Sequence, residues 1–397
     1  MILIWSTKCF FFFSKTGWRV NADKLDFSGE PEPAYSCISP IRSFENGHDS
    51  VFIDFLFNTE SICSIRALLL REKDPERWDM IWSLMSHNEA RAGMAYWTEK
   101  HQPIFTMIRD TIGLKQFSVE DIDTVLGIFL VNDFEINAKV DEEEWTSQGQ
   151  NSLRGLFQIA SIPNHDCLAN TVHTFESINE GFRMTVRAGR AIKKGSEITH
   201  SYVDTQEPYL VRQELLKMGK FFQCACSRCT DPTELGTYSS ALKCPKCRAA
   251  VVSTNPSITT ADWGCVKCDK TFDCLRISRV TGAVKDALEK LEPNTTNPKM
   301  CDIPAHEAFL KKFGQILHEN HVHMVMAKYP LAKMYGRMAG WEADKLTEDQ
   351  LKRKQQLCEE VTVLLIIKFS NSSYIFIAFE NQHIMIAFNS LKLELGN

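Results

Sequence analysis

Two cysteine pairs in the middle of the chain have the spacing of a structural zinc site. Cys244-x-x-Cys247 is followed after seventeen residues by Cys265-x-x-Cys268. Each pair places two thiolates on one tight turn, and two such turns complete a tetrahedral set of four ligands. Because protein sulfur fills all four positions, none stays open for water or substrate. The spacing therefore predicts a zinc ion that stabilises the fold and takes no part in catalysis.

A second group of cysteines lies shortly before these pairs. Cys224-x-Cys226-x-x-Cys229 supplies three thiolates, one fewer than a tetrahedral site needs. Such a triplet recruits its fourth ligand from elsewhere in the chain. Spacing alone leaves four ligand-competent candidates open, which are His165, Cys167, Cys274 and Cys301.

Composition is that of an ordinary soluble protein with 397 residues, 44% of them hydrophobic and 24% charged. The net charge of -5 gives no basic field that would attract nucleic acid. Seven of the fourteen cysteines lie within 224–268, bunched as in metal sites and unlike a disulfide framework, which favours the cytoplasm or nucleus. Charged and polar residues interrupt the apolar runs near both ends, so neither a signal peptide nor a membrane span is predicted.

Helices are predicted ahead of the cysteines. Asp74-Pro75 supplies a cap and a first-turn proline for a helix that carries Trp78, Ile81, Trp82 and Met85 on one face. Ser118 and Asp121 form a capping box before a helix over about 119–130, and another helix is expected at 103–110. Residues 1–65 show no sustained period.

Strands are predicted where the apolar period shortens to two, between about 131 and 203. Met184 and Val186 alternate with charged and polar residues in a half-buried strand at 182–188, and shorter strands are expected at 171–175 and 197–202. Gly195 marks the turn before the last strand. The cysteine-rich stretch 224–274 has little periodicity, so metal and not a core should order it.

Helical periodicity returns after residue 276. The predicted apolar faces are Ala283, Ala287, Leu288 and Leu291, then Phe309, Phe313, Ile316 and Leu317, then Met324, Ala327, Leu331 and Met334. Successive helices joined by short polar connections predict an antiparallel helical array.

Several segments resemble the SMYD (SET and MYND) family of SET-domain proteins. Asn164-His-Asp-Cys167-Leu-Ala-Asn170 is similar to the central SET motif, and Ser201-Tyr202 follows it in the family's order. Phe222-Gln-Cys-Ala-Cys-Ser-Arg-Cys229, preceded by Arg212-Gln213, is similar to the post-SET segment. Short segments at 86–89, 131–136 and 231–238 resemble the arthropod, msta-like branch of this family. The resemblance covers about 66 to 360.

The resemblance implies an α+β fold with a SET-type β-rich core and a helical insertion. A cysteine-rich, zinc-binding post-SET region and a C-terminal antiparallel helical array follow. The implied divisions are a divergent or irregular N-terminal segment at 1–65, the helical SET insertion at 66–130, the SET core at 131–203, the post-SET and zinc-binding region at 204–275, the helical domain at 276–361 and an atypical tail at 362–397.

The resemblance also implies roles for single residues. S-adenosylmethionine would bind in one pocket, while a lysine side chain enters a narrow channel from the opposite face. Tyr202 is the expected catalytic residue beside the transferred methyl group, and Cys167 becomes the fourth ligand of the Cys224, Cys226 and Cys229 triplet. The residues expected to contact the cofactor are Asn132, Asn164, His165, Tyr202 and Phe222, the last by stacking on the adenine.

Two family features do not match. The MYND zinc module is not found in the sequence, and only Thr16–Ala22 is at all similar to the family's glycine-rich SET loop. We therefore weigh two functions. The first is a zinc-containing, S-adenosylmethionine-dependent protein-lysine methyltransferase acting on histone or non-histone protein. The alternative is a catalytically inactive SET scaffold that binds partner proteins such as transcriptional regulators; neither a membrane nor nucleic acid is an expected partner.

Overall fold

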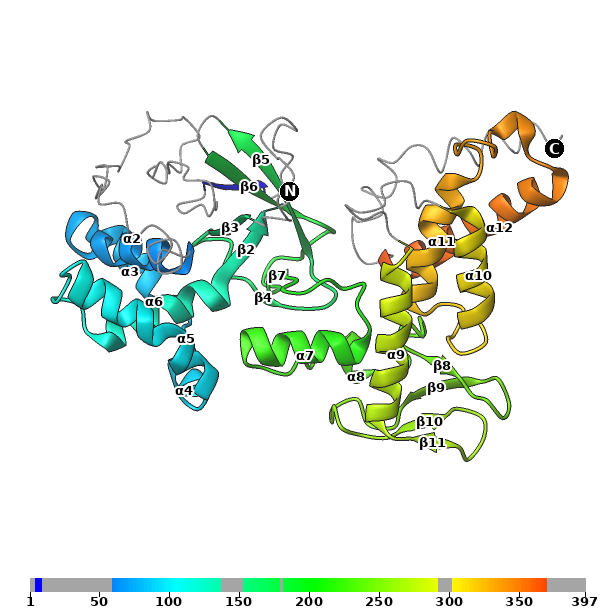
Figure 1. Cartoon of the computed structure of the whole chain (residues 1–397), viewed down its shortest axis with the longest axis horizontal. Helices are drawn as coiled ribbons and strands as arrows, with labels where there is room; N and C mark the ends of the chain where they lie inside the picture. The colour runs from blue at the N-terminus through cyan, green and yellow to red at the C-terminus, as the bar shows by residue number, and fades with distance from the viewer. Residues whose placement is uncertain (1–3, 9–58, 137–152, 179–180, 292–301, 370–397) are drawn as a thin grey trace, which may run out of the picture. The chain divides into compact units, whose positions relative to one another are not determined.

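The computed structural model describes residues 4–8, 59–136, 153–178, 181–291 and 302–369. These residues form two compact units, and the chain passes between them several times. The first unit takes its described residues from 1–164, 171–188 and 219–221, and the second from 165–170, 189–218 and 222–397. Helices and strands occur in the same chain, so the predicted α+β class is confirmed (Figure 1). No helix in the described ranges has the length and hydropathy needed to cross a bilayer.

The first unit contains a cluster of helices around an apolar core. Its helices are α2 (Thr59–Lys73), α3 (Pro75–Trp82), α4 (Asn88–Ala92), α5 (Ala95–Thr106), the π-helical turn η1 (Met107–Thr111) and α6 (Val119–Asn132). The side chain of Asp74 accepts a hydrogen bond from the Arg77 amide, and Ser118 and Asp121 form the capping box, so both predicted helix starts are confirmed. The predicted helix at 103–110 is the end of the longer α5 and η1. Helix α3 ends at Trp82, so Met85 lies beyond it and is exposed.

A three-stranded antiparallel sheet completes the first unit, in the order β1 (Ile4–Lys8), β6 (Gly181–Ala188) and β5 (Thr171–Ile178). A separate pair joins β2 (Asp133–Ile136) to β3 (Leu153–Leu156). Met184 and Val186 of β6 are buried against Phe157, as the alternation predicts. Strand β1 and the start of α2 lie within 1–65, where no regular element was predicted. Pairing with β6 supplies the backbone hydrogen bonds that β1 could not form alone.

The second unit begins where β4 (Asn164–His165) ends. It contains β7 (Thr199–His200), α7 (Tyr209–Lys220), the short helix α8 (Ser227–Thr230) and a four-stranded sheet. The sheet has the order β11 (Thr271–Phe272), β10 (Trp263–Cys265), β9 (Ala250–Ser253) and β8 (Leu242–Lys243). The predicted turn at Gly195 is confirmed by its left-handed φ of 86°. The strand expected at 197–202 is present but only two residues long. The cysteine-rich stretch contains a sheet that was not predicted, because its strands are too short to show a period.

Four long helices follow the sheet, as the predicted helical array requires (Figure 1). They are α9 (Cys274–Glu289), α10 (Ile303–Phe313), α11 (Val322–Met334) and α12 (Glu348–Phe369), with a 3-10 turn η2 (Ala343–Lys345) before the last. All four predicted apolar residues of α11 are buried. The predicted face of α9 was partly wrong, because Val284 is buried and Ala283 is exposed. Ile316, expected on the face of α10, is 38% exposed beyond the end of that helix.

A fully buried arginine holds the helices of the first unit together. The Arg91 guanidinium donates to the Ser86 carbonyl and lies 3.0 Å from the Asp123 carboxylate, and it stacks 4.3 Å from the centre of the Trp97 ring. Helix α6 approaches it closely, because a Cβ added at Gly127 would lie 2.2 Å from an Arg91 nitrogen. Only glycine leaves room for the guanidinium at this position.

We therefore expect Gly127→Ala to destabilise the protein by about 1–3 kcal/mol, the usual cost of overpacking a well-filled core. Gly93→Ala is the matched control, because a Cβ there meets nothing within 4 Å. Thermal unfolding should show a lowered midpoint for Gly127→Ala alone. Equal midpoints in the two variants would contradict the contact between α6 and Arg91.

Candidate functional site

The structure brings Cys167 to the cysteine triplet, 57 residues away from Cys224 in the sequence. The ligand sulfurs of Cys167, Cys224, Cys226 and Cys229 all lie within 4.8 Å of one another. Cys167 Sγ is 3.5 Å from Cys229 Sγ and 4.0 Å from Cys224 Sγ. Four sulfurs bound to one zinc at about 2.3 Å in a tetrahedron would be about 3.8 Å apart, so the donors fit the metal. The separations are far too long for disulfides, whose sulfurs lie about 2.05 Å apart.

Two side-chain amides fix the two chain segments that carry the ligands of this first tetrad. Asn170 fixes the segment that carries Cys167, because its side chain donates to the Glu197 carbonyl and accepts from the Thr199 amide. Gln213 of α7 exchanges two hydrogen bonds of 2.9 Å with the backbone of Cys224, one with each end of the side-chain amide. Each of the two segments that carry the sulfur ligands is thus held by a pair of hydrogen bonds between a side-chain amide and the backbone.

The predicted second tetrad is also assembled. Cys244, Cys247, Cys265 and Cys268 lie within 4.8 Å of one another, with Sγ–Sγ distances of 3.4 Å between Cys247 and Cys265 and 3.6 Å between Cys244 and Cys268. Cys244 and Cys247 lie in the turn between β8 and β9, whereas Cys265 ends β10 and Cys268 lies in the turn before β11. Desolvation raises the pKa of Cys265, but backbone N–H groups and neighbouring thiols outweigh it and lower the pKa to about 6. Cys265 thus favours the thiolate form that a metal binds, whereas at Cys268 a backbone N–H is outweighed by burial and by hydrogen bonds with the neighbouring thiols, which raise its pKa to about 12.

Three rings meet beside the first tetrad. The His165 ring centre is 5.4 Å from that of Tyr202 and 5.9 Å from that of Phe222, and the last two rings lie 6.4 Å apart, nearly perpendicular. Helix α7 ends at Lys220, and Phe221 takes a left-handed φ of 62° that turns the chain before Phe222. The structure therefore brings together three of the predicted cofactor-site residues.

His165 links this aromatic cluster to the metal ligands. Its Nδ1 accepts a hydrogen bond of 3.0 Å from the Tyr202 backbone N–H, and its Nε2 lies 3.4 Å from Cys167 Sγ. Because Nδ1 is an acceptor, we assign the proton of the neutral ring to Nε2, which can donate to the sulfur. Burial is the main cause that lowers the pKa of His165 to about 4, so the ring is neutral at physiological pH.

The other two predicted cofactor residues, Asn132 and Asn164, belong to the first unit. Asn132 ends helix α6, and its side-chain nitrogen donates to the carbonyls of Met85 and Ile128 at 2.8 Å each. Asn164 is exposed at the end of that unit. Asn132 thus has a structural role in the first unit, and its predicted role toward a cofactor stays a prediction.

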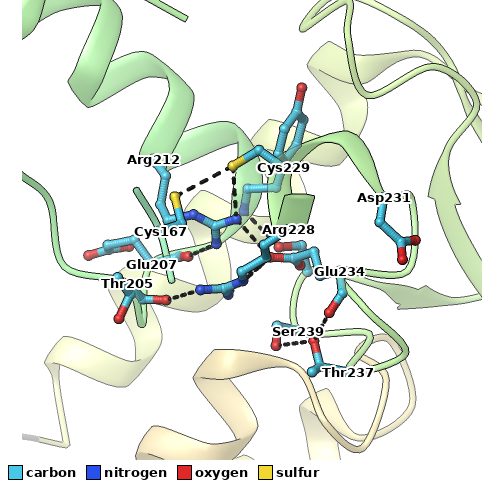
Figure 2. A network of polar contacts seen from close by, with 12 residues as sticks. Cys167, Thr205, Glu207, Arg212, Arg228, Cys229, Asp231, Glu234, Thr237 and Ser239 are labelled. Atoms are coloured by element: carbon cyan, nitrogen blue, oxygen red, sulfur yellow. Dashed lines mark hydrogen bonds and ion pairs between the residues drawn. The ribbon is translucent and has the colours of Figure 1, made fainter. Parts of the chain in front are cut away.

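Sequence reasoning did not single out a set of buried charges behind the first tetrad. Arg212 and Glu234 are buried, and an Arg212 nitrogen lies 2.8 Å from the Glu234 carboxylate and 3.6 Å from Cys229 Sγ (Figure 2). Arg228 contacts the same carboxylate at 3.0 Å. The sequence did offer one indication of this network, because its three charged residues lie in or next to the segments around the cysteine triplet that resemble the family.

Comparison with known proteins agrees with this geometry. Residues 52–203 match the SET domain family. The chain is 29% identical over 252 residues to "SET domain-containing protein SmydA-8, isoform A" of Drosophila melanogaster, covering 62% of this chain and 50% of that protein. It is 27% identical over 188 residues to "Histone-lysine N-methyltransferase Smyd1" of Mus musculus, covering 45% of this chain and 36% of that protein.

The chain is therefore similar to SMYD-type proteins, with a SET domain match at residues 52–203. It is also 32% identical over 158 residues to "Histone-lysine N-methyltransferase ASHR1" of Arabidopsis thaliana, covering 39% of this chain and 30% of that protein. This SMYD-type chain spans about half the length of the SmydA-8 isoforms it matches. The predicted family resemblance is confirmed.

We expect the purified SMYD-type chain to contain two zinc ions. Cys167→Ser should remove one and Cys247→Ser the other, because each deletes one ligand of a four-sulfur site. Elemental analysis of the dialysed protein measures the content. Cys274→Ser is the control, since this half-buried thiol belongs to neither tetrad and its loss should leave two ions bound. A wild-type content near zero in folded protein would contradict both sites.

Proposed function

We propose that the SMYD-type chain is an S-adenosylmethionine-dependent protein-lysine N-methyltransferase with two structural zinc ions. The observation that carries the proposal is the cluster of His165, Tyr202 and Phe222 beside the first tetrad, of which His165 and Tyr202 lie in the matched SET domain. Similarity to proteins named histone-lysine N-methyltransferases supports the reaction class. The lysine-bearing substrate, on a histone or another protein, is part of the proposal.

The cofactor would be held mainly by aromatic and amide groups. Phe222 is half-buried and offers a flat face on which an adenine can stack, an interaction worth about 0.5–1.5 kcal/mol beyond the area it buries. His165, Asn164 and Asn132 are the proposed polar contacts to the rest of the molecule. When bound, S-adenosylmethionine supplies a methyl group activated on a sulfonium.

Tyr202 is the proposed catalytic residue. Burial, followed by the nearby charge of Glu197, raises the pKa of its hydroxyl, so the phenol keeps its proton at neutral pH. A neutral hydroxyl can orient a lysine amine through hydrogen bonds without attracting it as a counter-ion. The hydrogen bond from its own backbone N–H to His165 fixes the Tyr202 main chain, and such positioning is a large part of what enzymes contribute to transfer reactions.

The two zinc ions would have a purely structural role, because each has four sulfur ligands and no open position. The first zinc would join the segment that carries His165 to the segment that carries Phe222. Proposed partners are a protein with an accessible lysine and, in the cell, transcriptional regulators. The proposed location is the cytoplasm or the nucleus, in keeping with reduced thiols.

We expect Phe222→Ala to weaken S-adenosylmethionine binding about three- to tenfold, the loss of one stacking contact. Isothermal titration of the zinc-loaded protein measures the affinity. Phe272→Ala is the control, because Phe272 is a half-buried ring of β11 outside the three-ring cluster. Equal affinity in wild type and Phe222→Ala would remove Phe222 from the proposed site.

Tyr202→Phe should abolish detectable methyl transfer while S-adenosylmethionine still binds, because only the hydroxyl is lost. Incorporation of labelled methyl into histone and lysate proteins measures the activity. Tyr329→Phe, a half-buried tyrosine of α11, is the control and should keep full activity. A wild-type chain that is folded, holds zinc and binds no cofactor would favour the alternative function, an inactive SET scaffold for partner proteins.

A further inference from the structure

The first tetrad is backed by a buried charge network that the proposed reaction does not use. Arg212 lies on α7, Arg228 on α8, and Glu234 in the loop that follows. All three side chains are buried, with exposed fractions of 0%, 6% and 4%. Buried charges of this kind are expensive to desolvate and need a partner for each charge. The negative charge of the adjacent ligand sulfurs is a physical reason for burying two arginines here.

Each arginine is held by an oxygen partner in addition to the shared carboxylate. Arg212 donates to the Glu207 carbonyl at 2.7 Å, and Arg228 donates to the Thr205 carbonyl at 2.8 Å (Figure 2). Only Arg212 also reaches a ligand sulfur, at 3.6 Å from Cys229 Sγ. An arginine guanidinium keeps its proton in proteins, so Arg212 brings a full positive charge to the ligand sulfur.

Local hydrogen bonds hold the loop that carries Glu234 in an unusual backbone conformation. Glu234, Leu235 and Gly236 all have left-handed φ values, of 51°, 61° and 78°, although only the last is a glycine. Asp231 stabilises this turn, since its side chain accepts from the amides of Thr233 and Leu235 at 2.8 and 3.1 Å. Thr237 closes it by donating to the Glu234 carbonyl at 2.8 Å. The strained backbone directs the carboxylate inward to both arginines, and their charges lower the pKa of Glu234 to about 2 against the effect of burial.

A divalent cation in four thiolates leaves an excess of two negative charges in a buried site. We propose that Arg212, oriented by Glu234, is the positioning residue that offsets part of this excess and donates a charge-assisted hydrogen bond to the Cys229 sulfur. The inference rests on the zinc occupancy proposed above, and not on methyl transfer. The second tetrad has a different environment: among the described contacts its sulfurs receive backbone N–H groups, such as that of Lys267 at 3.4 Å from Cys265 Sγ, and no arginine. The two sites should therefore respond differently to the loss of Arg212.

The test compares zinc release from the two sites of one protein. In the full chain loaded with zinc, Arg212→Lys and Arg212→Met should weaken metal binding at the first site about ten- to a hundredfold, the usual effect of removing an outer-shell partner. Competition with a chromogenic chelator measures release, and Cys167→Ser and Cys247→Ser assign the two phases. Glu234→Gln should also speed first-site release, because it frees the Arg212 side chain. Arg276→Met, an exposed arginine over Phe272, is the control and should change neither phase.

A second measurement distinguishes a hydrogen bond from Arg212 to the Cys229 sulfur from a general contribution of Arg212 to folding stability. In a Cys247→Ser background, cobalt loaded in place of zinc reports on the first site alone. Arg212→Lys should move the sulfur-to-cobalt charge-transfer absorption to lower energy, because a thiolate that has lost an N–H donor is more electron-rich. If Arg212→Met does not fold, Arg212→Lys and Glu234→Gln carry the test.

Folded Arg212→Lys and Glu234→Gln variants with wild-type zinc release and an unchanged cobalt spectrum would overturn the role of Arg212. A wild-type first site that binds neither zinc nor cobalt would overturn the metal assignment itself. Both results are read without S-adenosylmethionine, so they are distinct from a failure of the methyltransferase proposal.

Discussion

The convergence of four sulfurs from two distant segments is the constraint on which the second unit depends. Cys167 follows β4, whereas Cys224 and Cys226 precede α8 and Cys229 lies within it. Bringing four thiols within bonding distance of one metal costs chain entropy. Without a metal, contacts among the buried thiols would offset little of that cost. The segments between them carry Tyr202 and α7, so their placement depends on the same closure. The metal ligands thus determine where the aromatic cluster forms.

Hydrogen bonds transmit that placement to the proposed reaction centre. His165 accepts from the Tyr202 backbone on one side and approaches a ligand sulfur on the other, so ring, tyrosine and metal ligand form one connected set. Beside Cys229, Arg212 brings a positive charge into a buried environment, where Glu234 holds its guanidinium. The guanidiniums of Arg212 and Arg228, less the charge of Glu234, would reduce the excess of two negative charges on a zinc tetrathiolate to about one, so the site can lie next to an apolar core at a lower desolvation cost.

The sequence predicts those features that depend on local spacing. Two Cys-x-x-Cys pairs identify the second tetrad, and the caps at Asp74 and Ser118 set helix starts correctly. Cys167 is different, because spacing left four candidates open and only the family resemblance selected it. Strand β1 and the sheet β8–β11 were missed, since elements of two to five residues are decided by their partners and not by local period. The Arg212 network was missed because charged side chains are normally expected at the surface.

The most direct test of this account is the linkage between the first metal and S-adenosylmethionine. Isothermal titration should be run on wild type, Cys167→Ser and Cys247→Ser, each verified as folded and analysed for zinc. The account predicts that loss of the first zinc weakens S-adenosylmethionine binding strongly, whereas loss of the second leaves the affinity close to that of wild type. Equal affinities in all three proteins would contradict it, because the cofactor site would then form without the sulfur ligands proposed to hold it.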